Sequence, residues 1–467
     1  MSANLYTDIQ GHRADKVCLH QGDKSLTYGE FYRAIEHFAR ALQARGVKQG
    51  DRIAVERFSG SDLLTAYYGS ALLGVSVVPL PFVDEERIIG AMQASGAVLK
   101  LDSMPSADES VKDDLSFGNN DEAMVIFTSG TTSSKLKGVR LAHQGISEIC
   151  HYMNDTMQMN AQCIELVFAS LDHAFGFGRC HSILQMGGTL VLPTSLNNPF
   201  SVFKLIEQHQ CNAFSSAPSM IAALLRLGGE ELSSLVERIK WIQTGAMRFD
   251  PLFRKQLCEA LPKTRIFLHY GLSEAMRVTF FELNTHLHKA GTEGLASGCS
   301  RIRIVNECGE VLAQGESGRI AIQGSNLCLG YLDDEYWQSQ LLDGWFATSD
   351  LGYLDEDQFL VFLGRYDDVI NYNGVLVHPD EIESKLVSLF PKNAFCVVGI
   401  PDPGKVKDAI VTLCVEGETS ISMRDVANHM QGKDANLMPN KLVKVDTLPK
   451  TRSGKVSRAE LIKQLVS

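Results

Sequence analysis

The chain is organised around the sequence MVIFTSGTTSSKLKGV, residues 124–139. Residues 124–127 are apolar and predict a buried strand, and a loop of hydroxyl residues and glycine follows directly. Such a loop suits phosphate, because backbone N–H groups and hydroxyls donate to anionic oxygens and lysines add positive charge. It is not a Walker A loop, since Lys137 precedes Gly138 and no hydroxyl residue follows the lysine. The stretch therefore predicts a phosphate site at the end of a strand, with a Ser/Thr-rich surface turn as the alternative.

Helices and strands alternate on both sides of this stretch. Residues 26–47 predict a helix with Thr27 as its N-cap, and strands are expected at 51–55 and 75–80 with a helix at 62–73 between them. This alternation indicates an α/β layer with a mainly parallel sheet. From about Gly298 the pattern becomes β-rich, and a compact tail begins near Arg365.

We therefore expect an α/β fold with two domains. The large N-terminal domain, residues 1–364, should contain several sheets and a β-rich distal part, and the small α+β C-terminal domain should span residues 365–467. Ligands of open α/β sheets gather at the carboxyl ends of the strands, so residues at predicted strand ends are candidate pocket walls.

Composition narrows the class of protein. A chain of 467 residues can bury a large core and should divide into at least two domains. The formal charge of −11 argues against nucleic acid, and no apolar run approaches the roughly 20 residues of a membrane span. Eleven cysteines are scattered singly, without a C-x-x-C pair, which predicts reduced thiols and no structural zinc. Because the start also lacks a signal-peptide pattern, a cytoplasmic protein is expected.

Five further motifs follow in order along the chain. They are HYGLSE (269–274), GWFATSD (344–350), GRYDDVI (364–370), Asn373-Gly374 with DEIE (380–383), and LPKTRSGKVSR (448–458). Together with the phosphate loop, and at these separations, they resemble the core motifs of the adenylate-forming superfamily. This superfamily comprises acyl- and aryl-CoA synthetases, stand-alone adenylation enzymes and luciferase-like proteins. The ordered set is far more specific than any single motif.

The resemblance implies a large domain and a small mobile domain, with the active site between them. Members activate a carboxylate with ATP to give an acyl-adenylate and pyrophosphate, and usually pass the acyl group to a thiol. The implied cofactors are ATP and Mg²⁺, and the implied partners are a small carboxylic acid and either CoA or a carrier protein. Two anions meet in the first step, so the site must neutralise charge.

The resemblance assigns the nucleotide site to particular residues. Glu274 matches the glutamate that helps to place Mg²⁺, and Asp350 matches the ribose-binding aspartate, with Arg365 as a second ribose or phosphate contact. In isolation each of these would more often be a solvated surface charge. The other expected ATP- or AMP-binding residues are Thr128, Ser129, Gly130, Thr131, Thr132, Lys137, Tyr270, Gly271 and Ser273.

Three positions in the tail match catalytic elements of the superfamily. Lys455 matches the lysine that reaches the carboxylate and α-phosphate oxygens during adenylation. Asp367 matches the hinge about which the small domain rotates, and Gly374, with Asn373, would then enter the active site beside the thiol. Each also has a plainer reading, as a tail lysine, a surface aspartate and a hairpin turn.

The phosphate loop departs from the superfamily's TSGTTGxPKG pattern. Ser133 replaces glycine, Leu136 takes the place of proline, and one additional residue precedes Lys137-Gly138. Whether Lys135 or Lys137 contacts phosphate is therefore open.

The acid-binding residues are expected on several segments. The sequence DHAFG (172–176) resembles the acyl-CoA synthetase pattern F-H-x-x-G, which makes His173 a pocket wall, with a structural histidine as the alternative. Arg277 either pairs with a polar or anionic group of the acid or lies at the surface. The other expected pocket residues are Thr244, Gly245, Ala246 and His269.

Three functions compete. The leading one is a ligase that joins a non-amino carboxylic acid to CoA or to a carrier protein. The second is a stand-alone amino-acid adenylation enzyme that loads a peptidyl carrier, because amino-acid-activating relatives carry an aspartate near Asp172. The third is a non-catalytic binding relative, against which the joint presence of Glu274, Asp350 and Lys455 argues.

Overall fold

The computed structural model describes residues 4–82, 84–106, 115, 118, 120–128, 136–195, 201–227, 232, 235, 237–245, 249–372, 375–390, 393–401, 409–430, 438–450 and 456–466, with the backbone alone at 227, 367, 371–372 and 375–376. The chain forms two compact units. The first comprises residues 1–128, 135–302 and 322–344, and the second comprises 129–134, 303–321 and 345–467.

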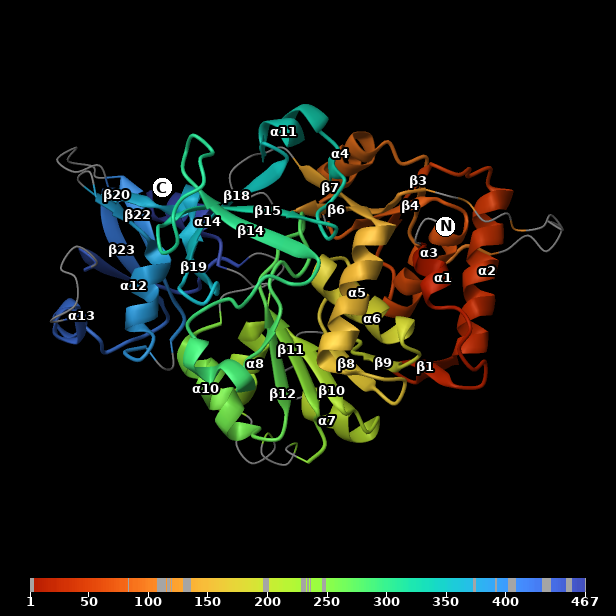
Figure 1. Ribbon diagram of the computed structural model, residues 1–467, viewed down its shortest axis with the longest axis horizontal. Coiled ribbons are helices and arrows are strands. Elements are labelled where there is room, and N and C mark those ends of the chain that lie inside the picture. The colour runs from red at the N-terminus through yellow and green to blue at the C-terminus, as the bar shows by residue number, and fades with distance from the viewer. Residues whose placement is uncertain are drawn as a thin grey trace. The chain divides into compact units, whose positions relative to one another are not determined.

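The largest sheet of the first unit has eight strands, in the order β13-β12-β11-β10-β8-β9-β1-β2. Neighbouring strands from β12 to β1 are parallel, and only β2 and β13, at the two edges, run antiparallel to their neighbours. In Figure 1, β8, β10, β11 and β12 lie side by side. The bounds are β1 Val17–Gln21, β2 Lys24–Thr27, β8 Ile164–Phe168, β9 Thr189–Leu192, β10 Ala213–Ser216, β11 Trp241–Gly245, β12 Arg265–His269 and β13 Phe281–Glu282.

A second sheet of the same unit has six strands, in the order β16-β7-β6-β4-β3-β5. It contains β6, whose buried residues 124–127 are those of the predicted strand. Strands β3 to β6 are parallel, whereas β7 turns back antiparallel to β6. The bounds are β3 Arg52–Glu56, β4 Ser76–Leu80, β5 Leu99–Leu101, β6 Glu122–Thr128, β7 Lys137–Ala142 and β16 Gly330–Tyr331. The predicted α/β layer with mainly parallel sheets is confirmed.

Helices of the first unit carry the expected amphipathic pattern. Helix α2 begins after Thr27, whose side chain forms a reciprocal capping box with Glu30, and it buries Phe31, Ile35, Phe38 and Leu42 as the spacing predicted. The bounds are α1 Leu5–Asp8, α2 Tyr28–Ala44, α3 Gly60–Leu72, α4 Glu85–Ser95, α5 His143–Met157, α6 Ala174–Gln185, α7 Ser201–Gln208, α8 Pro218–Leu227, α10 Pro251–Ala260, η1 Asn284–Lys289 and α11 Asp334–Ser339.

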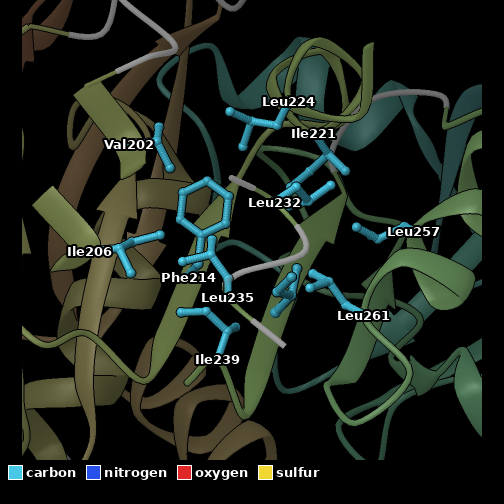
Figure 2. A pocket seen from close by; sticks show the side chains of 11 residues that line it. Val202, Ile206, Phe214, Ile221, Leu224, Leu232, Leu235, Ile239, Leu257 and Leu261 are labelled. Atoms are coloured by element: carbon cyan, nitrogen blue, oxygen red, sulfur yellow. The ribbon is translucent and has the colours of Figure 1, made fainter. Parts of the chain in front are cut away.

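Strands β10 and β11 pack against α7, α8 and α10 through apolar side chains. Figure 2 shows a small pocket in this layer, with Phe214 of β10 between Ile206 of α7 and Leu224 of α8. All eleven side chains that line it are apolar, so it offers no group for catalysis or for binding a charged ligand. It is a gap in the hydrophobic core and not a candidate active site.

The second unit begins with most of a five-stranded sheet, ordered β14-β15-β18-β17, with β19 paired to β18. It continues into a C-terminal region, residues 366–466, that contains the hairpin β20-β21 and the sheet β22-β23-β24. Helices α12 and α13 bury Ile382, Leu386 and Val426 in one core with β22 and β23. The expected domain boundary at Arg365 falls on the last residue of β19 and stays a prediction.

The elements of this part of the chain are β14 Ser300–Val305, β15 Gly318–Gly324, β17 Leu341–Leu342, β18 Trp345–Leu354, β19 Leu360–Arg365, η2 Tyr366–Asp368, β20 Ile370–Tyr372, β21 Val375–Val377, α12 Pro379–Leu386, β22 Phe395–Pro401, β23 Ala409–Glu416, α13 Met423–Met430, β24 Lys441–Val445 and α14 Arg458–Val466. Over the ranges that the structure describes, no helix has both the length and the apolar character that a bilayer crossing requires.

Candidate active site

Glu274 lies in the turn that follows β12, together with Tyr270, Gly271 and Ser273. The hydroxyl of Tyr331 in β16 donates a hydrogen bond of 2.7 Å to Oε1 of Glu274. Burial and the charge of Glu274 raise the pKa of Tyr331, so this phenol stays protonated and remains a donor. The backbone is held as well, because the N–H of Cys328 donates to the carbonyl of Glu274 at 2.7 Å. The turn therefore presents the carboxylate in a defined position.

The environment of Glu274 fits a magnesium ion that is shared with phosphate. Among the residues that the structure describes, no lysine, arginine or histidine forms an ion pair with Glu274, and no cluster of three metal-binding side chains occurs. Mg²⁺ needs no such cluster, because it commonly takes one or two carboxylates together with phosphate oxygens and water. One positioned carboxylate without a basic partner is a donor set of that kind.

Lys137 stands at the far end of the predicted phosphate loop. It is the first residue of β7 and pairs across the ladder with Thr128, the last residue of β6, so the two ends of the loop are neighbours. Its Nζ donates to the hydroxyl of Tyr336 at 2.8 Å and lies 4.7 Å from the centre of that ring. Tyr336 in turn stacks on Tyr331, with ring centres 5.4 Å apart.

These contacts join two predicted site residues of opposite charge, Lys137 and Glu274, through two tyrosines. Neither Tyr331 nor Tyr336 was predicted from the sequence. Both lie between the motifs HYGLSE (269–274) and GWFATSD (344–350). Residues Ser129, Gly130, Thr131, Thr132 and Lys135 lie outside the described residues, so the choice between Lys135 and Lys137 as the phosphate contact stays a prediction.

The predicted pocket residues Gly245 and His269 end β11 and β12 and pair directly with each other. A Cβ atom on Gly245 would lie 2.3 Å from the carbonyl oxygen of His269, so only glycine allows this close approach. The imidazole of His269 is buried, lies 3.3 Å from Nε2 of Gln243 and packs against the ring of Phe175 at 5.2 Å. Burial, and after it the charge of Arg277, lower the pKa of His269 well below its ordinary value, so the ring is neutral.

Arg277 is buried, with 2% of its surface exposed, so the expectation of a possible surface position is wrong. Its guanidinium donates to the carbonyls of Ala174 and Phe175, at 2.9 and 2.8 Å, and lies over the Phe175 ring at 5.4 Å. These two residues open α6. Arg277 therefore packs with Phe175, which is partly exposed, and with the buried His269 at the carboxyl end of β12. Of the other predicted pocket residues, Thr244 is buried in β11 and Ala246 lies outside the described residues.

His173 occupies the N-cap position of α6 and is partly exposed. Its Nε2 lies 3.8 Å from Oδ1 of Asp172, which also accepts a short hydrogen bond from the hydroxyl of Ser170. Asp172 is thus engaged by its own neighbours. This arrangement weakens the reading in which Asp172 pairs with the amine of an amino-acid substrate.

In the second unit, the structure brings Asp350 and Arg365 together. They face each other across β18 and β19, and Nε of Arg365 lies 3.7 Å from Oδ1 of Asp350. The backbone N–H of Asp350 donates to Oγ1 of Thr348 at 3.0 Å. The two residues predicted to contact ribose are therefore cross-strand neighbours, although fifteen positions separate them in the sequence.

Arg458 is a charged centre that the sequence did not single out. Its guanidinium contacts Oδ2 of Asp368 at 3.0 Å, Oδ1 of Asp380 at 3.2 Å and Oε1 of Glu383 at 2.9 Å. Burial acts to lower the pKa of Arg458, but the charges of Glu383, Asp380 and Asp368 outweigh it and raise the pKa well above its ordinary value. The contacts join three of the motifs, which the sequence presents as separate stretches.

Arg458 begins α14 and follows Lys455 by three residues. Lys455 and Gly374 themselves lie outside the described residues, and Asp367 is described by its backbone alone, as part of η2.

Comparison with known proteins assigns the family. The family model described as AMP-binding enzyme matches residues 6–116 and 98–332, and the model of the AMP-binding enzyme C-terminal domain matches residues 381–455. The chain belongs to the AMP-binding enzyme family. Among its relatives is the feruloyl-CoA synthase of an Amycolatopsis species, 27% identical over 481 residues that cover 95% of each chain.

Solved structures agree with the fold of this AMP-binding enzyme. ATP-bound MatB from Rhodopseudomonas palustris superposes with a TM-score of 0.87 at 22% identity and covers 99% of each chain. The o-succinylbenzoate CoA synthetase MenE from Bacillus subtilis, solved with ATP and magnesium ion, superposes with a TM-score of 0.86 at 23% identity and covers 98% of this chain and 99% of that one.

The comparisons confirm the predicted superfamily, the α/β fold class and the enzyme class, which is an AMP-forming acid–thiol ligase. The predicted cofactors, ATP and Mg²⁺, are those of this family of enzymes. The roles of individual site residues stay predictions.

Proposed function

We propose that this enzyme activates a non-amino carboxylic acid with ATP and transfers the acyl group from the adenylate to CoA. The observation that supports this most directly is the chain of contacts from Lys137 through Tyr336 and Tyr331 to Glu274. It sets a cation at one end of the predicted phosphate loop and a positioned carboxylate beside the same pair of tyrosines. Such an arrangement suits a magnesium–triphosphate group, which needs both a carboxylate for the metal and positive charge for the phosphates.

In the first half-reaction, a carboxylate oxygen of the acid attacks the α-phosphorus, and the bond to the bridging oxygen of pyrophosphate breaks. Glu274 would hold Mg²⁺, which neutralises charge on the phosphates when it is bound. Tyr331 keeps the carboxylate of Glu274 in place through its hydrogen bond. Asp350 would accept hydrogen bonds from the ribose hydroxyls beside Arg365, and Lys455 would face the oxygens of the acid and the α-phosphate.

In the second half-reaction, the thiol attacks the acyl carbon and AMP leaves. We assign Asp367 to the hinge of the small domain 365–467, and Asn373-Gly374 to the segment beside the thiol. Replacing Asp367 with proline should spare adenylation and block transfer, because proline fixes φ at the point of rotation. Equal loss of both half-reactions in rapid-quench experiments would place the hinge elsewhere.

CoA is proposed as the acceptor because two of the similar proteins named above, feruloyl-CoA synthase and o-succinylbenzoate CoA synthetase, carry CoA in their names, and a carrier protein is the alternative. An amino acid is the less favoured substrate, since Asp172 already accepts a hydrogen bond from Ser170. A reducing compartment such as the cytoplasm suits the eleven cysteines, all of which are unpaired and most of which are buried.

A pyrophosphate-release screen over aliphatic, aromatic and amino acids tests the proposal, with CoA added in a second step. Release of pyrophosphate should require a carboxylic acid, ATP and Mg²⁺. When CoA is present, mass spectrometry should detect the thioester of the acid with CoA. Glu274→Gln is the matched control, because glutamine keeps the shape of the side chain and an oxygen that accepts from Tyr331 but removes the negative charge. Absence of release with every acid would favour a non-catalytic relative, and release with amino acids alone would favour the peptidyl-carrier reading.

A further inference from the structure

Three arginines are among the largest fully buried side chains, and they differ in their partners. Arg179 pairs with Glu165 at 2.5 Å, and Arg254 pairs with Glu293 at 2.6 Å. Arg277 has no carboxylate partner in the part of the chain that the structure describes. Glu165, which does act on Arg277 electrostatically, is already bound to Arg179.

The charge of Arg277 persists at neutral pH. Burial lowers its pKa to about 10, which still leaves the guanidinium protonated. Two of its N–H groups reach the carbonyls of Ala174 and Phe175, but its buried Nε has no hydrogen-bond partner. A buried positive charge without a counter-ion is costly, and a buried donor without an acceptor adds to that cost.

The side chains around Arg277 do not supply the missing negative charge. His269 is neutral, and Phe175 offers only the face of its ring. Oε1 of Gln243, whose Nε2 lies 3.3 Å from Nδ1 of His269, is also buried without a hydrogen-bond partner. Gln243, through His269, and Arg277 thus lie on the side of the sheet that faces α6, near the carboxyl ends of β11 and β12. Open α/β sheets bind their ligands at that edge.

We propose that Arg277 binds a second carboxylate of the substrate, so that the enzyme activates one end of a dicarboxylic acid and holds the other. Nε–H of Arg277 donates to that carboxylate in a charge-assisted hydrogen bond. This inference rests on the proposed function, and it adds the class of acid to it.

Gly178 of α6 provides a way to test the position of the guanidinium without changing its charge. A Cβ atom at residue 178 would lie 2.4 Å from Nη1 of Arg277 and 2.6 Å from Cε of Met276, both of which are ends of flexible side chains. Gly178→Ala should therefore displace the guanidinium while the helix remains intact, since alanine favours helix over glycine.

The experiment compares each diacid of three to six carbons with its methyl half-ester by pyrophosphate release, so that only the second charge differs. For the wild type, kcat/KM should be roughly 10- to 100-fold higher with the diacid. Arg277→Gln and Gly178→Ala should reduce this ratio to near one, and Arg277→Lys should retain part of it. Arg254→Gln is the matched control, because it removes a buried arginine that has its own carboxylate and should leave the ratio unchanged.

If the wild-type enzyme has the same kcat/KM for half-esters or longer monoacids as for diacids, the proposal is overturned, while the ligase function is unaffected. The proposal is also overturned if the Arg277→Gln variant accepts longer acids and keeps the preference for diacids. Arg277 would then limit only the length of the pocket. Calorimetric binding of diacid and half-ester to the wild type gives a readout without turnover. If no acid releases pyrophosphate, the proposed function fails, and calorimetry still decides whether a dicarboxylate binds through Arg277.

Discussion

Replacing Arg458 with methionine should destabilise the C-terminal region, residues 366–466, and impair adenylation. Methionine keeps much of the length of arginine and removes its charge. The change leaves Asp368, Asp380 and Glu383 close together without the cation that they share. It also frees the carbonyl of Val397, which accepts from Nε of Arg458 at 3.2 Å.

The magnitude follows from the burial of the cluster. The exposed fractions are 17% for the side chain of Arg458 and 25, 12 and 16% for those of Asp368, Asp380 and Glu383. Removing one partner of a buried ion pair costs about 3 to 5 kcal/mol, and the remaining exposure favours the lower end of that range. For a region of about 100 residues, 3 kcal/mol lowers the midpoint of unfolding by roughly 10 to 20 °C.

Scanning calorimetry measures the midpoint, and hydrogen exchange shows whether the loss is confined to the C-terminal region. Arg424→Met is the matched control, because Arg424 is an exposed arginine of α13 in the same region. Adenylation should fall in the Arg458 variant because the segment that ends at this residue carries Lys455. Adding Glu383→Gln should restore part of the stability, since one of the unpaired charges is then gone. Equal midpoints for Arg458→Met and Arg424→Met would show that the contacts of Arg458 do not stabilise the C-terminal region.

Three further predictions follow from single residues. Lys455→Ala should lower pyrophosphate exchange roughly 10²- to 10³-fold while transfer from a supplied acyl-adenylate survives, and unchanged exchange would remove the lysine from the mechanism. Tyr331→Phe removes a 2.7 Å hydrogen bond to the carboxylate of Glu274, so adenylation should need about tenfold more Mg²⁺, and an unchanged Mg²⁺ titration would contradict that role. Burial is the main cause that lowers the pKa of His143 to about 4. On acidification the unfolded chain therefore binds a proton at His143 near pH 6.5, whereas the folded chain does so only near pH 4. The free energy of unfolding should therefore fall between pH 6.5 and 4. At pH 5 the loss is about 2 kcal/mol, and His143→Gln should show a smaller drop in melting temperature from pH 7 to pH 5 than the wild type, whereas an equal drop would assign the acid sensitivity to other groups.

The elements around the nucleotide site were largely predictable. The apolar run 124–127 became part of β6, Thr27 caps α2, and the family assignment from the motifs is confirmed. These features depend on short stretches of chain, in which period, capping and turn residues act over a few positions. Asp350 and Arg365 were each found by their motifs, but their cross-strand pairing needed the register of β18 and β19.

Other partnerships could not be read from the sequence. Tyr331 lies 57 residues from Glu274, and Tyr336 lies 199 residues from Lys137. Arg277 had two readings of equal standing, substrate contact or surface charge, until its burial beside α6 excluded the second. Periodicity reports which face of an element is buried, and it carries no information on which distant side chain lies opposite.

By itself, the sequence determined that this chain is an adenylate-forming enzyme with an α/β fold, because the motifs combine residue type with spacing and each is a local property. The arrangement of the charges required the tertiary structure: Tyr331 positions Glu274, Arg458 joins three carboxylates, and Arg277 is buried with no carboxylate partner among the described residues. The physical reason is that the energy of a charge depends on its burial and on the atoms within a few ångströms, which the fold brings together from distant parts of the chain.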